Sequence, residues 1–330
     1  MPPIRRILVA VKNPRQKSFP ALTKAAALAR ALDAGLELFH AVTGPIAFEA
    51  YTDAELRKFE DAQRLRHRDR LEAMAEPLRR RGLRVSTAVE WDYPSHEAVV
   101  RHAQRSRADL IVVGRHATRH VARWLLRYTD WELLRQSPVP VLLVKKPRAW
   151  RAPAILAAVD PSHAFAKTAQ LDRGILEIGA AVSDATRGAL HVLHAYVPTI
   201  DDVSEGMLRQ PDASQRIVDL AAKQAARRLD KALHGAGLDD LKKSRRHVVA
   251  RHPVDAIPAM VKKLGCDIVV MGALARSGLK GLFIGNTAER LLDDLPCDLL
   301  VVKPPGFKSQ VSAGIRGPEL YFPTPPSGMI

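Results

Sequence analysis

The sequence predicts an α/β protein that consists of two tandem, doubly wound parallel sheets of five strands each, a Rossmann-like architecture. Short runs of valine, isoleucine and leucine alternate with amphipathic stretches along the chain. Such continuous apolar runs are typical of parallel strands that helices cover on both faces. The pattern also occurs twice. The matching segments are residues 7–12 (ILVAVK) with 155–160 (ILAAVD), 109–114 (DLIVVG) with 267–272 (DIVVMG), and 139–145 (VPVLLVK) with 297–303 (CDLLVVK).

The elements of the two copies follow the same order. Each expected strand is a Val/Ile/Leu run, and each expected helix has apolar residues at helical spacing. In the first copy we expect strands at 5–11, 36–42, 84–89, 109–113 and 140–145, and helices at 18–33, 53–81, 95–106 and 129–135. In the second copy we expect strands at 154–159, 189–196, 246–250, 267–271 and 298–302, and helices at 164–183, 212–235, 253–264 and 286–294.

The size of each copy, about 150 residues, is that of a domain and excludes a solenoid of short repeats. We expect a first domain at 1–147, a linker at 148–153, a second domain at 154–304, and a Pro- and Gly-rich tail at 305–330 that is disordered or irregular. A pseudo-two-fold axis should relate the two copies through their fifth strands, because an apolar edge strand invites pairing.

The composition indicates a globular protein and argues against a membrane-spanning or disulfide-rich one. With 47% hydrophobic residues the chain has enough apolar side chains for two cores, and it has no apolar run long enough to span a membrane. The apolar run at the N-terminus is too short for a signal peptide. Two cysteines cannot form a disulfide framework, and they suit a reducing cytoplasm. The net charge is +16, and residues 1–150 contribute most of it with 28 basic against 16 acidic residues.

A glycine-rich segment, residues 271–289 (MGALARSGLKGLFIGNTAE), follows the fourth strand of the second copy. Glycines let backbone N–H groups converge on an anion, and a helix N-terminus near Asn286 adds more donors. The segment therefore indicates a phosphate site, although an ordinary connector has the same composition. Asp160 ends the first strand of this copy, where its carboxylate could accept a ribose hydroxyl or serve as a helix N-cap.

These features resemble the universal stress protein family in its tandem form. The family loop has the pattern G-x2-G-x9-G-(S/T), in which Gly272 and Gly285 fit the first and last glycines. Ala275 departs from the pattern at the second glycine, and Asn286 stands at the Ser/Thr position, followed by Thr287. The resemblance covers residues 1–304 and excludes the tail.

The resemblance implies a cytoplasmic stress-response protein whose second domain binds ATP, AMP or ADP, with or without Mg²⁺. The residues that it places around the nucleotide are Asp160, Ser162, Ala195, Met271, Gly272, Ala275, Arg276, Gly278, Gly285, Asn286 and Thr287. It implies no catalytic residue and no protein-held metal, and it makes a homodimer one expected assembly.

The first copy departs from this pattern. Lys12 stands where the strand-one aspartate is expected, and His120, Arg123 and Arg127 stand where the second copy has glycines. We therefore expect no nucleotide in the first copy. Residues 115–127 should be partly helical, with Trp124 and Leu125 filling the crevice.

Three other functions remain open at this point. A slow Mg²⁺-dependent ATPase needs only a positioned nucleotide. A lipid or acyl ligand could take the place of the nucleotide. The basic first half, with its Arg-rich helix at 53–81, could also associate with nucleic acid, although few aromatic residues accompany the arginines.

Overall fold

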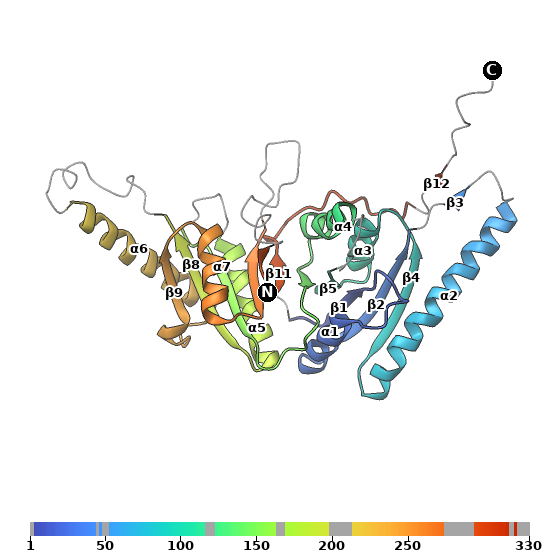
Figure 1. Cartoon of the computed structure of the whole chain (residues 1–330), viewed down its shortest axis with the longest axis horizontal. Coiled ribbons are helices and arrows are strands. Elements are labelled where there is room, and N and C mark those ends of the chain that lie inside the picture. Colours follow the sequence, from blue (N-terminus) through green and yellow to red (C-terminus); the bar gives the residue numbers. More distant parts are fainter. Residues whose placement is uncertain are drawn as a thin grey trace, which may run out of the picture. The chain divides into compact units, whose positions relative to one another are not determined.

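The computed structural model describes residues 3–43, 46–47, 53–115, 123–162, 169–197, 213–273, 294–316 and 320–321. The chain divides into two compact units (Figure 1). Residues 2–147 and 308–330 form one unit, which we call the N-terminal domain, and Arg148–Phe307 form the C-terminal domain.

The N-terminal domain is a five-stranded parallel sheet with helices between its strands. Its strand order is β4-β2-β1-β5-β6, and every pair of neighbours in it is parallel. The elements are β1 (Arg6–Ala10), α1 (Pro20–Ala31), β2 (Gly35–Val42), β3 (Ile46–Ala47), α2 (Asp53–Arg80), β4 (Val85–Trp91), α3 (Ser95–Arg105), β5 (Leu110–Gly114), α4 (Arg123–Gln136) and β6 (Val141–Val144).

The C-terminal domain repeats this architecture with the strand order β9-β8-β7-β10-β11, again entirely parallel. Its elements are β7 (Ala154–Val159), α5 (Ala169–Thr186), β8 (Ala189–Tyr196), α6 (Ala213–Gly235), the 3-10 helix η3 (Lys243–Arg245), β9 (Arg246–Ala250), α7 (Pro253–Leu264), β10 (Ile268–Gly272) and β11 (Asp298–Val302). The expected fold class is confirmed. The helix expected at 286–294 lies almost wholly outside the described residues, and the pseudo-two-fold pairing of the copies stays a prediction.

Helices cover both faces of the N-terminal sheet. Successive residues of a strand point to opposite faces. Phe39 of β2 stacks on His102 of α3 with ring centroids 4.2 Å apart, whereas the next residue, His40, lies 4.6 Å from the ring of His67 on α2. Helices α2 and α3 therefore lie on opposite faces, as the doubly wound arrangement requires.

An aspartate at the same position of the two repeats holds strands together at the amino-terminal edge of each sheet. Asp109 accepts hydrogen bonds from the backbone N–H groups of Arg5 and Arg6 at 2.8 and 2.9 Å. Asp267 accepts one from Ala154 at 3.2 Å. Each aspartate precedes the fourth strand of its copy and holds the start of the first, which explains why this residue recurs in the repeat.

The segment after β11 returns to the N-terminal domain. The backbone N–H of Arg316 donates to Oδ1 of Asp92 at 3.0 Å, and its guanidinium lies 3.3 Å from Glu97. Asp92 is fully buried in a bidentate pair with Arg101. Further on, β12 (Leu320–Tyr321) pairs in parallel with β3. Part of the expected tail thus contacts specific groups of the N-terminal domain.

Gly272, at the end of β10, offers a test of helix-on-sheet packing. A Cβ atom there would lie 2.7 Å from Cδ2 of Leu171 on α5, which is closer than real Cβ contacts. We expect Gly272→Ala to lower the free energy of unfolding of the C-terminal domain by about 1–3 kcal/mol through overpacking. Urea denaturation measures this change. The matched variant Gly114→Ala should be nearly neutral, because its Cβ would lie 3.6 Å from Ala21. Equal losses in the two variants would contradict this account.

His102 predicts a pH dependence of stability. Burial lowers its pKa, but hydrogen bonds and charges from Glu37 and Glu90 outweigh burial and raise it to about 9. A pKa above the unfolded value contributes stability that is complete below about pH 6.5 and is lost as the pH rises to about 9. The contribution is about 3 kcal/mol. His102→Gln should destabilise the protein at pH 6 and much less at pH 9.5, as measured by urea denaturation. His234→Gln, at an exposed site, should show no such difference.

Candidate functional site

The candidate site lies at the carboxyl edge of the C-terminal sheet, where the strand order reverses between β7 and β10. Parallel α/β sheets bind ligands at such a switch point. Ala158 pairs in register with Met271, and Val159 pairs with His194. The next residues along each strand are Asp160, Ala195 and Gly272, so three of the expected site residues meet at one edge.

Asp160 is held in place and keeps one oxygen open. Its backbone N–H donates to Oδ1 of Asp172 on α5 at 3.0 Å, and the Ser162 hydroxyl donates to its Oδ1. Its other oxygen, Oδ2, is buried and has no hydrogen-bond partner among the described residues. An unpaired buried acceptor is costly, so this oxygen suits a donor supplied by a ligand, such as a ribose hydroxyl.

The remaining expected residues divide into two groups. Ala195, Met271 and Gly272 are buried at the edge beside Asp160. Gly272 also has a packing reason, since only hydrogen fits against Leu171 and Ile175. Ala275, Arg276, Gly278, Gly285, Asn286 and Thr287 lie outside the described residues. The structure thus describes the site residues expected on or next to the strands, and their role in binding stays a prediction.

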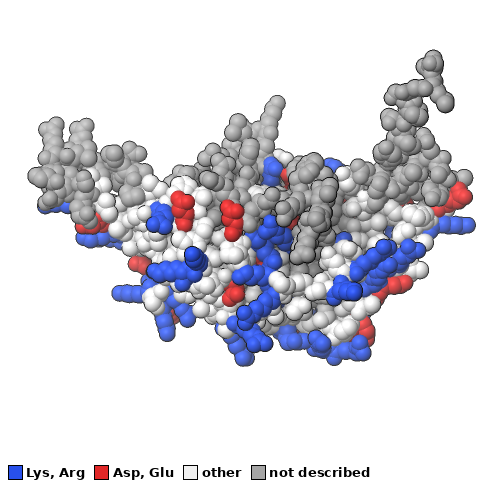
Figure 2. Space-filling model, viewed as in Figure 1, with Lys and Arg blue, Asp and Glu red and all other residues white. Residues whose placement is uncertain are grey.

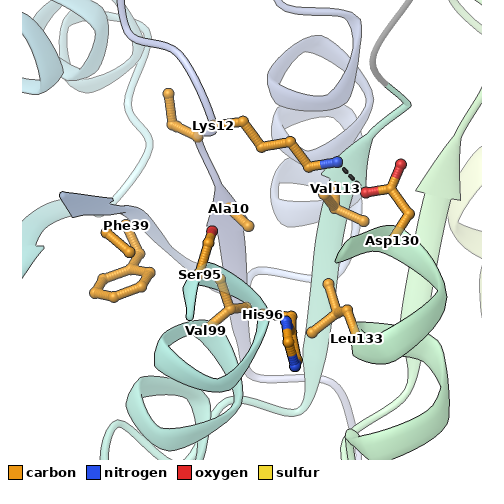
Figure 3. Close-up of a pocket in the computed structure, with 11 residues that line it drawn as sticks. Ala10, Lys12, Phe39, Ser95, His96, Val99, Val113, Asp130 and Leu133 are labelled. Atoms are coloured by element: carbon orange, nitrogen blue, oxygen red, sulfur yellow. Dashed lines mark hydrogen bonds and ion pairs between the residues drawn. The ribbon is translucent and has the colours of Figure 1, made fainter. Parts of the chain in front are cut away.

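The equivalent edge of the N-terminal domain is closed by an ion pair. Lys12 follows β1 at the position equivalent to Asp160, and Figure 3 shows its side chain reaching Asp130 on α4. The two side chains are only 18% and 10% exposed. The pocket around them, lined by Ala10, Ser95, His96, Val113 and Leu133 among others, leaves about 10 Å³ of free space. That volume is about what one water molecule needs.

Helix α4 begins at Arg123, so the helical expectation is confirmed for residues 123–127. The side chains of Trp124 and Leu125 lie outside the described residues, so the expectation that they fill the crevice stays a prediction. No role was expected for Asp130. Lys12 could have indicated this role, because a lysine at the end of a buried strand needs a carboxylate partner.

Among the residues that the structure describes, no helix is both long and apolar enough to cross a membrane. Within the same ranges, no three His, Cys, Asp or Glu side chains gather as a metal site. Cys266 and Cys297 are buried and form no disulfide. Burial raises the pKa of Cys266 to about 11, so its thiol stays protonated.

The family follows from comparison with known proteins. The family model described as the universal stress protein family matches residues 3–145 and again residues 154–303. The chain therefore belongs to the universal stress protein family and carries two of its domains in tandem, as expected from the sequence.

Several known proteins are similar to this chain over most of its length. Universal stress protein E of Photorhabdus laumondii is 26% identical over 70% of this chain and 73% of its own length. The protein of that name from Escherichia coli K12 is 28% identical over 70% and 72%. Among solved structures, a functionally unknown protein from Pseudomonas aeruginosa PAO1 has a TM-score of 0.69 and 26% identity, covering 91% of this chain and 93% of that one. A universal stress protein from Archaeoglobus fulgidus has a TM-score of 0.58 at 15% identity, covering 91% and 96%.

The pair of Lys12 and Asp130 predicts a large effect on stability. Asp130→Ala leaves the ammonium of Lys12, whose side chain is 18% exposed, without a counter-charge. It should lower the free energy of unfolding of the N-terminal domain by about 1–3 kcal/mol. The double variant Lys12→Met/Asp130→Leu should recover most of that loss, because it removes both charges. Urea denaturation measures both.

The control is the exposed pair of Arg84 and Asp33, with side chains 65% and 91% exposed. Asp33→Ala should change the free energy of unfolding by less than about 1 kcal/mol. A loss at Asp130 no larger than at Asp33 would show that the crevice pair does not stabilise the domain.

Proposed function

We propose that this protein is a cytoplasmic stress-response protein whose C-terminal domain binds an adenine nucleotide, ATP or AMP, at the carboxyl edge of β7, β8 and β10. Asp160 would accept hydrogen bonds from the ribose, Ser162 would hold its carboxylate, and Ala195 would border the base. The glycine-rich segment after β10 would hold the phosphates. The N-terminal domain would bind no nucleotide there.

The observation that carries the proposal is the open carboxylate oxygen of Asp160. It is buried at the switch point of the sheet and has no partner among the described residues. A ribose hydroxyl is a donor of the right kind for an ionised carboxylate, and a hydrogen bond to a charged group is stronger than one between neutral groups. An apolar or acyl ligand would leave this oxygen unsatisfied, so the site favours a nucleotide over that alternative.

The contrast between the domains supports the assignment to one domain. At the same strand position one domain has an open carboxylate and the other has an ammonium already neutralised by Asp130. Binding a nucleotide in the N-terminal crevice would require breaking that ion pair and expanding a space of about 10 Å³. We therefore propose a single nucleotide per chain.

The proposal predicts that Asp160→Asn weakens ATP and AMP binding by about 10- to 100-fold. The reason is that a hydrogen bond to a charged acceptor contributes about 1.5–3 kcal/mol. Titration calorimetry on the full chain measures the affinity, and mass spectrometry of ligand released from the purified protein identifies the natural nucleotide. Incubating the complex with Mg²⁺ and assaying ADP separates binding from slow hydrolysis.

Asp255→Asn, at an exposed position on α7, makes the same change of charge in the same domain and should leave the affinity unchanged. The proposal is wrong if the unmodified protein binds neither nucleotide at millimolar concentration. It is also wrong if Asp160→Asn binds as tightly as the Asp255→Asn control.

A further inference from the structure

A second polar cluster lies in the N-terminal domain, on the opposite face of the sheet from the closed crevice. Phe39 and Ala41 of β2 line the crevice, whereas His40 between them points to the other face, toward α2. There its ring lies against that of His67, with centroids 4.6 Å apart. We call this group, together with the neighbouring arginines 15, 66 and 70, the α2 cluster.

Two buried nitrogen atoms of the α2 cluster have no hydrogen-bond partner among the described residues. They are Nδ1 of His67 and Nη1 of Arg70. His40 differs, because its Nδ1 donates to the carbonyl of Val11 at 2.6 Å, which ties the cluster to the end of β1. A guanidinium N–H is always a donor, so the orphan on Arg70 requires an acceptor.

The cluster also carries positive charge that no described carboxylate neutralises. Arg15, Arg66 and Arg70 form no ion pair with a described residue, whereas Arg79 and Arg80, on the same helix, pair with Glu72 and Glu76. Figure 2 shows Lys and Arg side chains along the part of the surface where α2 lies.

The titration of the two histidines agrees with this geometry. Burial lowers the pKa of His67, and the charges of Arg70, Arg15 and Arg66 lower it further. The pKa of His40 is lowered to about 4, mainly by burial. The hydrogen bond to Val11 raises this pKa, whereas the charges of His67 and Arg70 lower it further. The nearby positive charges thus disfavour protonation of the two histidines. A bound anion would have the opposite effect, because it stabilises the protonated imidazole.

We propose that the α2 cluster is a binding site for a compact, multiply charged phosphate group, such as a diphosphate, held by Arg66, His67 and Arg70 with Arg15 closing from the loop after β1. The site has the required chemistry: guanidinium donors for bidentate contact, an imidazole that gains a proton beside an anion, and partial exposure for entry. The site is separate from the proposed nucleotide site, which lies in the other domain.

The test uses inorganic pyrophosphate and ¹H–¹⁵N NMR of the histidine rings in the full chain. We expect pyrophosphate to shift the His67 resonances and to raise the pKa of His67, because the anion stabilises the imidazolium form. His67→Asn identifies the resonances. Asp160→Asn should leave this response unchanged, which separates the α2 cluster from the nucleotide site.

A matched pair of double variants locates the site on the helix. Each double variant removes two charges from α2: one is Arg66→Gln/Arg70→Gln and the other is Arg64→Gln/Arg68→Gln. Residues four apart lie on the same side of a helix, so each pair shares a side and the two pairs lie on different sides. We expect the first variant to weaken pyrophosphate binding at least about tenfold and the second to have little effect. Far-UV circular dichroism checks that both variants are folded.

Three outcomes would overturn the proposal. One is the absence of any response of His67 to pyrophosphate in the unmodified protein. Another is an equal loss of binding in the two double variants, which would indicate a general effect of charge. The third is a response of His67 to a short single-stranded oligonucleotide but not to pyrophosphate, which would make α2 a nucleic-acid surface.

Discussion

The constraint on which the rest of the structure depends is the burial of parallel strands on both faces. All residues of β6, β10 and β11 are buried, and in β5 only the final glycine is partly exposed. Such strands have no room for polar side chains except at their ends. Polar groups therefore collect at the two edges of each sheet. The amino-terminal edge uses Asp109 and Asp267 to tie strands together, and the carboxyl edge holds the groups that can meet a ligand.

The two domains use the same edge in opposite ways. In one domain the residue after the first strand is a carboxylate with an unsatisfied oxygen, and in the other it is an ammonium whose counter-ion comes from the same domain. One residue position thus separates the proposed nucleotide site, with its unpartnered carboxylate oxygen, from an edge occupied by an ion pair. The fold is common to both domains, so the difference in function must be argued from the site residues.

The sequence predicted the strands well because continuous apolar runs between helical stretches have few other interpretations. It also located Asp160, because a polar residue at the end of such a run must lie at the edge. It did not find the role of Asp130, since Lys12 and Asp130 are 118 residues apart. The contact between Asp92 and Arg316 joins residues 224 apart, and β3 and β12 have only two residues each. Long-range partners and very short strands leave no local pattern.

The return of residues 308–316 to the N-terminal domain has a consequence for biosynthesis. Domains of a growing chain fold largely in the order in which they leave the ribosome. Here the N-terminal domain receives contacts at Asp92 and Glu97 from Arg316, which follows Asp92 by 224 residues. The whole C-terminal domain must therefore be synthesised before the N-terminal domain is complete. A truncation between the C-terminal domain and Arg316 would remove contacts from the N-terminal domain.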